Sequence, residues 1–178
     1  MTTSRSTAAP VVDVIPAPPE QAPVLANLLE LYAHDFSEFL DLRLGPDGRF
    51  GYEHLPLYWE EPGRHPFLIR AGGHLAGFAL VRRGCETSRD AGVWDVAEFF
   101  VARGFRRLGV GTKAAHALWG KFPGSWQVRV MERNRKAKEF WARAVKDFVG
   151  GPVEPATFDE GGIVWHVFSF ESRPSAWS

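Results

Sequence analysis

The spacing of apolar residues divides the chain into short strands and amphipathic helices. Runs of β-branched and aromatic residues predict strands, and apolar residues that recur at intervals of three and four predict helices. The expected order is strand, helix, long loop, three strands, helix, strand, helix and two strands. Strands are expected at 11–15, 67–70, 75–83, 93–101 and 125–131, helices at 21–40, 112–119 and 134–145, and the final two strands on either side of the turn DEGG at 159–162.

The segment that follows the first helix, residues 41–66, has no clear hydrophobic period. It is rich in Gly, Pro and aromatic residues, and a loop of this length is usually functional or disordered. Tyr52, Tyr58 and Trp59 argue against disorder. We therefore expect an ordered loop with a functional role.

Length and composition indicate one globular unit. With 178 residues and 45% hydrophobic content, the chain is long enough for one well-buried core and short for two. We expect a disordered tail over 1–10, a single domain over 11–171 and a C-terminal tail over 172–178. The formal net charge is zero, so the chain lacks the positive field with which nucleic-acid binders attract a polyanion.

Other sequence features narrow the partners further. No uninterrupted apolar segment reaches the roughly 18 residues of a membrane-spanning helix. Cys85 is the single cysteine, which excludes an intramolecular disulfide and fits a reducing cytoplasm. The six histidines show no HxH or HxxxH pair, so no metal site is expected. The expected partners are small molecules, without nucleic acid or membrane, and the sequence leaves monomer and homodimer open.

The stretch FFVARGFRRLGVGTKAAHALW, residues 99–119, has the composition of a phosphate-binding turn. A Walker P-loop is excluded, because Val110 and Gly111 stand where Lys and Ser or Thr must contact phosphate and magnesium. A dinucleotide fingerprint stays as an alternative, since GVGTKA satisfies GxGxxA and Glu132 follows at the distance of a ribose-binding acid. Against it, the residues ARGFRRL separate the end of the strand at Val101 from Gly109, whereas the fingerprint needs the strand to run directly into its first glycine.

A third interpretation accounts for this spacer. A strand ends at Val101, a basic loop turns, and a helix begins whose first amides and positive dipole end face an anion. Arg106 and Arg107 add positive charge, and glycines at 109 and 111 let the backbone approach a pyrophosphate closely. The pattern RxxGxG, followed by a strand and then by NRKAKEFW, resembles the GNAT superfamily of acyl-CoA-dependent N-acetyltransferases.

The resemblance implies an α/β (α+β) fold and a site for acetyl-CoA as co-substrate, with no metal. The sheet would be mixed, mostly antiparallel, of about six to seven strands, flanked by helices and splayed between its two central strands. The main chain at the end of the strand before the loop would hold the pantetheine arm, and the loop would hold the pyrophosphate. The cofactor-binding residues implied in this way are Phe99, Phe100, Val101, Arg106, Arg107, Leu108, Gly109, Val110, Gly111, Thr112, Asn134, Ala137, Phe140 and Trp141. The alternative role of Asn134 is that of a helix N-cap.

The implied reaction is direct attack on acetyl-CoA by a primary amine, which we expect to belong to a small molecule. An alkyl amine with a pKa near 10 is mostly protonated at neutral pH, so a group must accept its proton. Glu98, in AEFFV, is the first candidate for this catalytic role, because it lies among apolar residues where a substrate ammonium would compensate its charge. Ala97 replaces the first acidic residue of the EDFFV found in similar polyamine-type members, so Glu98 acts either as base or as amine-binding group. Asp95 is the reserve candidate, and its alternative role is a solvated strand end.

The leaving thiolate has no assigned acid. The family often uses a tyrosine where this chain has Trp141, whose N–H has no useful acidity. Either Tyr52 or Tyr58 substitutes for it, or the thiolate leaves without help. A non-catalytic acyl-CoA sensor of the same fold therefore remains an alternative function. By resemblance, His34, Asp35, Glu38 and Tyr58 are expected in the wall of the acceptor site.

Overall fold

The computed structural model describes residues 9–84 and 92–173. Most of the expected N-terminal tail, the turn that contains Cys85 and residues 174–178 lie outside this part of the chain. The described elements are β1 (Val12–Pro16), η1 (Pro19–Gln21), α1 (Ala22–Phe36), α2 (Leu57–Glu60), β2 (Arg64–Ala71), β3 (His74–Arg83), β4 (Trp94–Val101), η2 (Arg103–Phe105), α3 (Val110–Lys121), β5 (Gly124–Met131), α4 (Arg135–Val149), β6 (Ala156–Glu160) and β7 (Ile163–Ser172).

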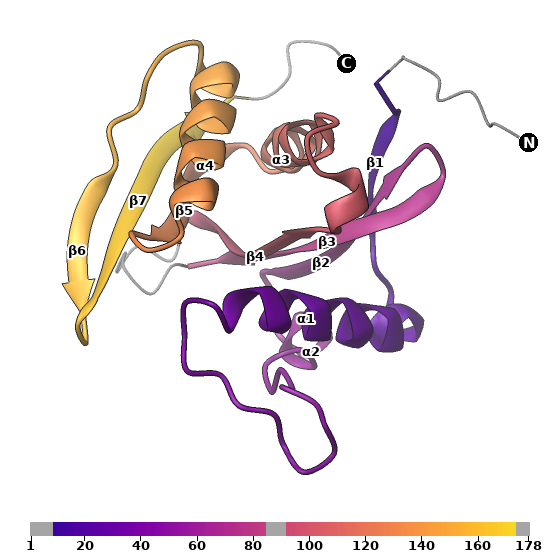
Figure 1. The fold of residues 1–178 in the computed structure, drawn as a ribbon. Coiled ribbons are helices and arrows are strands. Elements are labelled where there is room, and N and C mark those ends of the chain that lie inside the picture. The colour runs from indigo at the N-terminus through magenta and orange to yellow at the C-terminus, as the bar shows by residue number, and fades with distance from the viewer. Residues whose placement is uncertain (1–8, 85–91, 174–178) are drawn as a thin grey trace, which may run out of the picture.

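The strands form one twisted sheet between two layers of helix. Its order is β1-β2-β3-β4-β5-β7-β6, with seven strands in the described residues. Figure 1 shows α1 and α2 on one face of the sheet and α3 and α4 on the other. Each face has its own apolar cluster, because the strands alternate their side chains between the faces. Phe78, Leu80 and Phe100 pack toward α1, whereas Ala79, Val81 and Val96 pack toward α3 and α4.

The order of elements agrees with the sequence pattern, but several boundaries differ. The first helix ends at Phe36 rather than at residue 40, because the amides of Phe39 and Leu40 both bond to the Phe36 carbonyl in a tight turn. The helix expected at 134–145 continues to Val149 and ends where Gly150 adopts a φ of 81°. A left-handed glycine is a common helix terminus. The loop 41–66 is shorter than expected, since it contains α2 and gives way to β2 at Arg64.

The two central strands diverge, as expected. β4 and β5 form the one parallel pair among the described strands, and their register contains only Trp94 with Trp126 and Asp95 with Gln127. Beyond Asp95, β4 continues to Val101 with β3 as its partner and no pairing with β5. Backbone groups on that edge of β4 are therefore open to a ligand.

A β-bulge in β4 sets the direction of its acidic side chains. Leu80 of β3 pairs with Glu98, but the next residue, Val81, pairs with Val96, so Ala97 is the extra residue. In a regular strand, residues three apart point to opposite faces. Because of the bulge, Glu98 and Asp95 both point to the α1 face, opposite Leu80 and Arg82. Bulges of this kind re-aim side chains and are frequent beside active sites.

Candidate active site

Glu98, on the open central strand, is bound by two tyrosines from different elements. The Tyr32 hydroxyl of α1 donates to Glu98 Oε2 at 2.5 Å, and the Tyr52 hydroxyl from the loop after α1 donates to Oε1 at 3.0 Å. Tyr58 of α2, the third and last tyrosine of the chain, is buried close enough for the Glu98 charge to act on it. Two of the three tyrosines therefore donate to one carboxylate, and Tyr58 is buried in the same apolar cluster.

Burial raises the pKa values of Glu98 and of the three tyrosines around it. Burial raises the pKa of Glu98 above its usual range, and the hydrogen bonds from Tyr32 and Tyr52 oppose this only in part. Burial, together with the Glu98 charge, raises the pKa of Tyr32 and of Tyr52, and raises that of Tyr58 to about 12. The tyrosines consequently stay protonated at neutral pH, and Tyr32 and Tyr52 act as donors to Glu98. Such weak acids are poorly suited to protonate a leaving thiolate, the role considered for Tyr52 and Tyr58.

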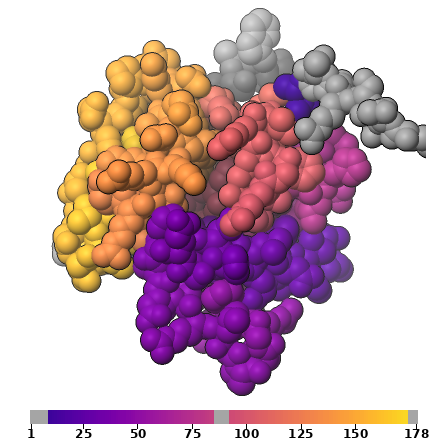
Figure 2. Space-filling model, viewed as in Figure 1, coloured from indigo at the N-terminus to yellow at the C-terminus, as the bar shows by residue number. Residues whose placement is uncertain are grey.

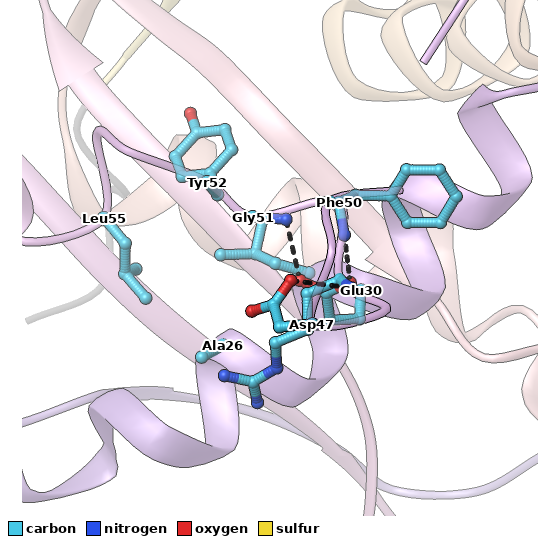
Figure 3. A pocket seen from close by; sticks show the side chains of 10 residues that line it. Ala26, Glu30, Asp47, Phe50, Gly51, Tyr52 and Leu55 are labelled. Atoms are coloured by element: carbon cyan, nitrogen blue, oxygen red, sulfur yellow. Dashed lines mark hydrogen bonds between the residues drawn. The ribbon is translucent and has the colours of Figure 1, made fainter. Parts of the chain in front are cut away.

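The loop that carries Tyr52 is attached to α1 by Glu30. The two Glu30 carboxylate oxygens accept hydrogen bonds from the amides of Phe50 and Gly51, at 2.8 and 3.0 Å (Figure 3). Tyr52 follows directly, and Glu30 and Tyr52 line the same pocket between α1 and the loop. Hydrogen bonds to an ionised acceptor are the stronger kind. Glu30 therefore fixes the place at which Tyr52 turns in toward Glu98.

Asp95 lies in a buried ion pair and is not a solvated strand end. Its side chain is fully buried, and Asp95 Oδ2 accepts from Arg82 Nε at 3.0 Å and lies 2.9 Å from Arg82 Nη2. Arg129 Nη2 of β5 lies 4.0 Å from the same oxygen. These contacts tie β3, β4 and β5 together at the point where β4 and β5 begin to diverge. Their geometry favours a structural role for Asp95.

The loop between β4 and α3 has the backbone conformation of an anion-binding turn. Arg107 has a φ of 63° and Gly109 a φ of 76°. When residues in right-handed and left-handed backbone conformations alternate, successive amide N–H groups point toward a common point. α3 begins directly afterwards at Val110 without a side-chain cap, so its first-turn amides face outward from the helix end. Arg107, Leu108 and Gly109 are exposed, Thr112 is half-buried, and Val110 is buried beneath them.

Arg106 has a different environment from the rest of this loop. Its guanidinium lies over the Phe100 ring on the α1 face, with Arg106 Nε bonded to the Val101 carbonyl at 2.7 Å. Arg106 Nη2 also donates to Asp35 Oδ2 of α1 at 2.6 Å. Asp35, expected in the acceptor wall, therefore contacts the predicted cofactor loop. Arg107, the next residue, is exposed like Arg106 and lies in the turn itself.

The N-terminal half of α4 packs against the open strand and α3. Phe140 and Trp141 both contact the Phe99 ring, with centroid separations of 6.1 and 5.1 Å. A Cβ at Gly111 would lie 3.0 Å from Phe140 Cε2, so Gly111 also allows α3 to pack closely on α4. Trp141 is buried in this aromatic layer, and Ala137 is half-buried beside it. Asn134 caps the helix, since its Oδ1 accepts from the Ala137 amide at 3.1 Å.

The remaining expected site residues differ in exposure. His34 and Glu38 are exposed near the C-terminal end of α1, whereas Tyr58 is buried under the loop. Glu132, the ribose-binding acid of the dinucleotide alternative, instead contacts Lys138 and His166. The mostly antiparallel sheet also differs from the parallel sheet of dinucleotide-binding folds. The dinucleotide alternative therefore has no structural support.

The roles of Tyr32 and Glu30 at the site were not predicted from the sequence. That pattern places Tyr32 on the apolar face of its helix and Glu30 on the solvated face. A tyrosine on an apolar face does carry a signal, because its buried hydroxyl usually needs a partner. Nothing in the local pattern around Glu30 indicates that it accepts from amides twenty residues away.

The open edge of β4, the anion-binding turn and the Glu98 cluster lie close together in the fold. In Figure 2, the surface is hollowed where α3, α4 and the N-terminal helix meet. Among the described residues, no group of three or more His, Cys, Asp or Glu side chains is arranged to hold a metal ion. None of the helices in residues 9–84 and 92–173 has the length and hydrophobicity needed to cross a bilayer.

Comparison with solved structures shows the same architecture. An acetyltransferase from Thermus thermophilus matches with a TM-score of 0.62 and 19% identity, over 89% of this chain and 97% of that one. The aminoglycoside acetyltransferase AAC(6')-Ib, in complex with coenzyme A, matches with a TM-score of 0.67 and 16% identity, over 90% and 95%. YncA of Salmonella typhimurium, in a structure with its cofactor acetyl-CoA, gives 0.58 and 11%, over 93% and 96%. At these identities the likeness establishes the fold.

Sequence comparison establishes the family. No curated protein matches the chain. The sequence model of the acetyltransferase (GNAT) family matches residues 25–145, which include most of α1, the open strand, the turn and most of α4. This match covers more than half of the chain and contains the two motifs on which the resemblance is based. The chain therefore belongs to the GNAT family of acetyltransferases.

Proposed function

We propose that this protein transfers the acetyl group of acetyl-CoA to a primary amine of a small molecule. The observation that carries the proposal is the position of Glu98, a half-buried carboxylate on the strand whose edge toward β5 is open. The two neighbours that hold CoA or acetyl-CoA support the choice of donor.

The residues present fit acetyl-CoA as the donor substrate. The unpaired edge of β4, from Phe99 to Val101, offers backbone groups to the pantetheine arm, apart from the Val101 carbonyl, which accepts from Arg106 Nε. The amides that follow Arg107 in the turn, together with its side chain, would bind the pyrophosphate. Amides directed at a developing oxyanion also stabilise the transition state of acyl transfer in a site that excludes water.

Glu98 would accept a proton from the substrate ammonium, directly or through a water molecule. The neutral amine then forms a C–N bond with the thioester carbonyl carbon, and collapse of the tetrahedral intermediate breaks the C–S bond. The second amine proton passes to the departing thiolate, and Glu98 releases its proton to solvent. The raised pKa of Glu98 brings it closer to that of a useful general base near neutral pH.

Thiolate departure needs no tyrosine in this scheme. A thiol with a pKa of about 8.5 leaves readily as its anion. Trp141, which replaces the tyrosine common in the family, is packed on Phe99 and acts as part of the wall. Its position supports a structural role in shaping the site rather than proton transfer.

The acceptor is proposed to be cationic. Glu98 lies among the tyrosine hydroxyls and close to Phe100, on the face of the sheet that α1 covers. A carboxylate bordered by aromatic rings suits an ammonium group through charge and cation–π attraction. His34 and Glu38, exposed near the end of α1, would contact a small polar acceptor.

The first test combines binding and turnover. Acetyl-CoA is titrated into the protein in a calorimeter, with NADH as the control, and thiol release is then followed with a panel of primary amines. We expect saturable binding of acetyl-CoA, none of NADH, and amine-dependent release of CoA. Binding without release by any amine would favour the acyl-CoA sensor, and absence of binding would contradict the proposal.

A change at Glu30 tests the role of the loop. Glu30→Gln is expected to raise the KM for the amine about fivefold, because weakened hydrogen bonds to Phe50 and Gly51 leave Tyr52 less well placed. The KM for acetyl-CoA should stay unchanged. Steady-state kinetics measures both constants, and Glu20→Gln, at an exposed position of η1, is the matched control. An unchanged amine KM would separate this loop from acceptor binding.

A further inference from the structure

Asp35 joins the helix on the acceptor side to the loop on the cofactor side. It lies in the last turn of α1, and its two carboxylate oxygens accept from different arginines, Arg103 and Arg106, each at 2.6 Å. The Asp35 side chain is 22% exposed, less than either arginine. Both arginines belong to the segment 102–109 that connects β4 with α3. One carboxylate therefore holds that segment at two points.

Arg106 extends this connection into the sheet. Besides Asp35, it bonds through Nε to the Val101 carbonyl and lies over the Phe100 ring, with its Cζ 5.6 Å from the ring centroid. The guanidinium therefore connects α1, the last residue of β4 and the loop. Planar charge-assisted contacts of this kind are specific in direction as well as strong.

The residue after Arg106 has a backbone conformation that needs support. Arg107 is the one residue other than glycine with a positive φ in the described chain, at 63°. An L-residue with a side chain adopts this conformation at an energetic cost, and it persists when the surroundings hold it in place. Asp35 contacts Arg106, directly before this position, and Arg103, earlier in the same segment.

We propose that Asp35 is a positioning residue that keeps the turn 102–109 in its anion-binding conformation and thereby raises the affinity for acetyl-CoA. This inference rests on the proposed function. Asp35 acts through Arg103 and Arg106, and the strained conformation at Arg107 is what it preserves. The same helix carries Tyr32, which contacts Glu98, so α1 contacts both the donor loop and the catalytic carboxylate.

The carboxylate of Asp35 is charged at neutral pH. Burial alone would raise the pKa of Asp35, but the hydrogen bonds from Arg106 and Arg103 outweigh burial, and the pKa is lowered. The carboxylate thus stays ionised at neutral pH. The amide of Asn has a similar shape without this charge, so Asp35→Asn is the appropriate substitution.

The test is the affinity of Asp35→Asn for acetyl-CoA, measured by calorimetry beside the wild-type protein. We expect the Kd to rise about tenfold, as for loss of charge-assisted bonds at a partly exposed site. The KM for acetyl-CoA should rise with it, whereas kcat at saturation and the amine KM stay close to wild type. Asp147→Asn, at an exposed position near the end of α4, is the control for loss of one negative charge.

A double-mutant cycle with Arg107→Gly tests the route of the effect. Glycine adopts a positive φ without strain, so the turn should no longer depend on Asp35. Loss of the Arg107 charge weakens binding equally in both backgrounds and cancels in the cycle. We expect Asp35→Asn to change the Kd by about twofold or less when Arg107 is replaced by Gly.

Three outcomes would overturn the inference. An unchanged Kd would show that the turn keeps its conformation without Asp35, and a tighter Kd would show that Asp35 competes with the ligand for Arg106. An equal loss in both backgrounds of the cycle would show that Asp35 does not act through the Arg107 conformation. Absence of acetyl-CoA binding by the wild-type protein is a different result, because it contradicts the proposed function itself.

Discussion

Glu98→Gln is expected to lower kcat about 100-fold while leaving the Kd for acetyl-CoA within about twofold of the wild-type value. Glutamine keeps the size of the side chain and accepts hydrogen bonds from Tyr32 or Tyr52 through one oxygen, but it cannot take a proton from an ammonium. Cofactor binding should persist because the proposed donor site uses the backbone edge of β4 and the turn. Single-turnover kinetics and calorimetry measure the two quantities separately.

The pH profile gives a second readout of the same residue. A general base works when it is deprotonated, so kcat/KM should rise as the pH rises through the pKa of Glu98. Burial raises that pKa, which places the acid limb above the usual range of a carboxyl group. Tyr52→Phe removes a hydrogen bond that lowers the pKa, and the limb should move to still higher pH. In Glu98→Gln this limb should disappear.

Three results would argue against this role. Loss of both turnover and acetyl-CoA binding in Glu98→Gln would indicate a structural function. Full retention of kcat would mean that another group, or solvent, accepts the proton. An acid limb that does not move in Tyr52→Phe would show that it reports a different group, such as the substrate amine.

Asp95→Asn is expected to lower the free energy of unfolding by about 3 kcal/mol, with little change in kcat for the folded enzyme. Asp95 is fully buried against Arg82, and removal of one member of a buried ion pair leaves the other charge poorly compensated. Urea denaturation measures the loss of stability. Active-site titration with acetyl-CoA corrects kcat for the fraction of folded protein.

The double variant Arg82→Met with Asp95→Asn is the control for this prediction. Replacing both charges removes the uncompensated guanidinium, so a substantial part of the lost stability should return. A loss of turnover by orders of magnitude at unchanged stability would contradict the structural role. Such a result would indicate that Asp95, like Glu98, takes part in catalysis.

Local patterns were sufficient to predict most of the secondary structure and to locate the glycine-containing turn between β4 and α3. Alternation of apolar residues depends on neighbours in the chain, so strands such as β3 and β4 and the apolar face of α1 could be located from the sequence. The turn RRLGVG is also local, since its glycines and the helix that follows lie within a few residues. Splaying of the central strands followed from the family resemblance and is confirmed by the short β4–β5 register.

The chemistry of the site depended on contacts that no local pattern contains. Tyr32 and Tyr52 reach Glu98 across 66 and 46 residues, and Asp35 reaches Arg106 across 71. These contacts arise because α1 packs on the face of β4 that carries Glu98, and the bulge at Ala97 decides which side chains point to that face. Hydrophobic periodicity in the sequence therefore determined the strands and helices, and short local motifs determined the family. The order of strands, the bulge and the packing of α1 on the sheet decided which charges and hydroxyls meet, because such pairings depend on tertiary packing rather than on spacing along the chain.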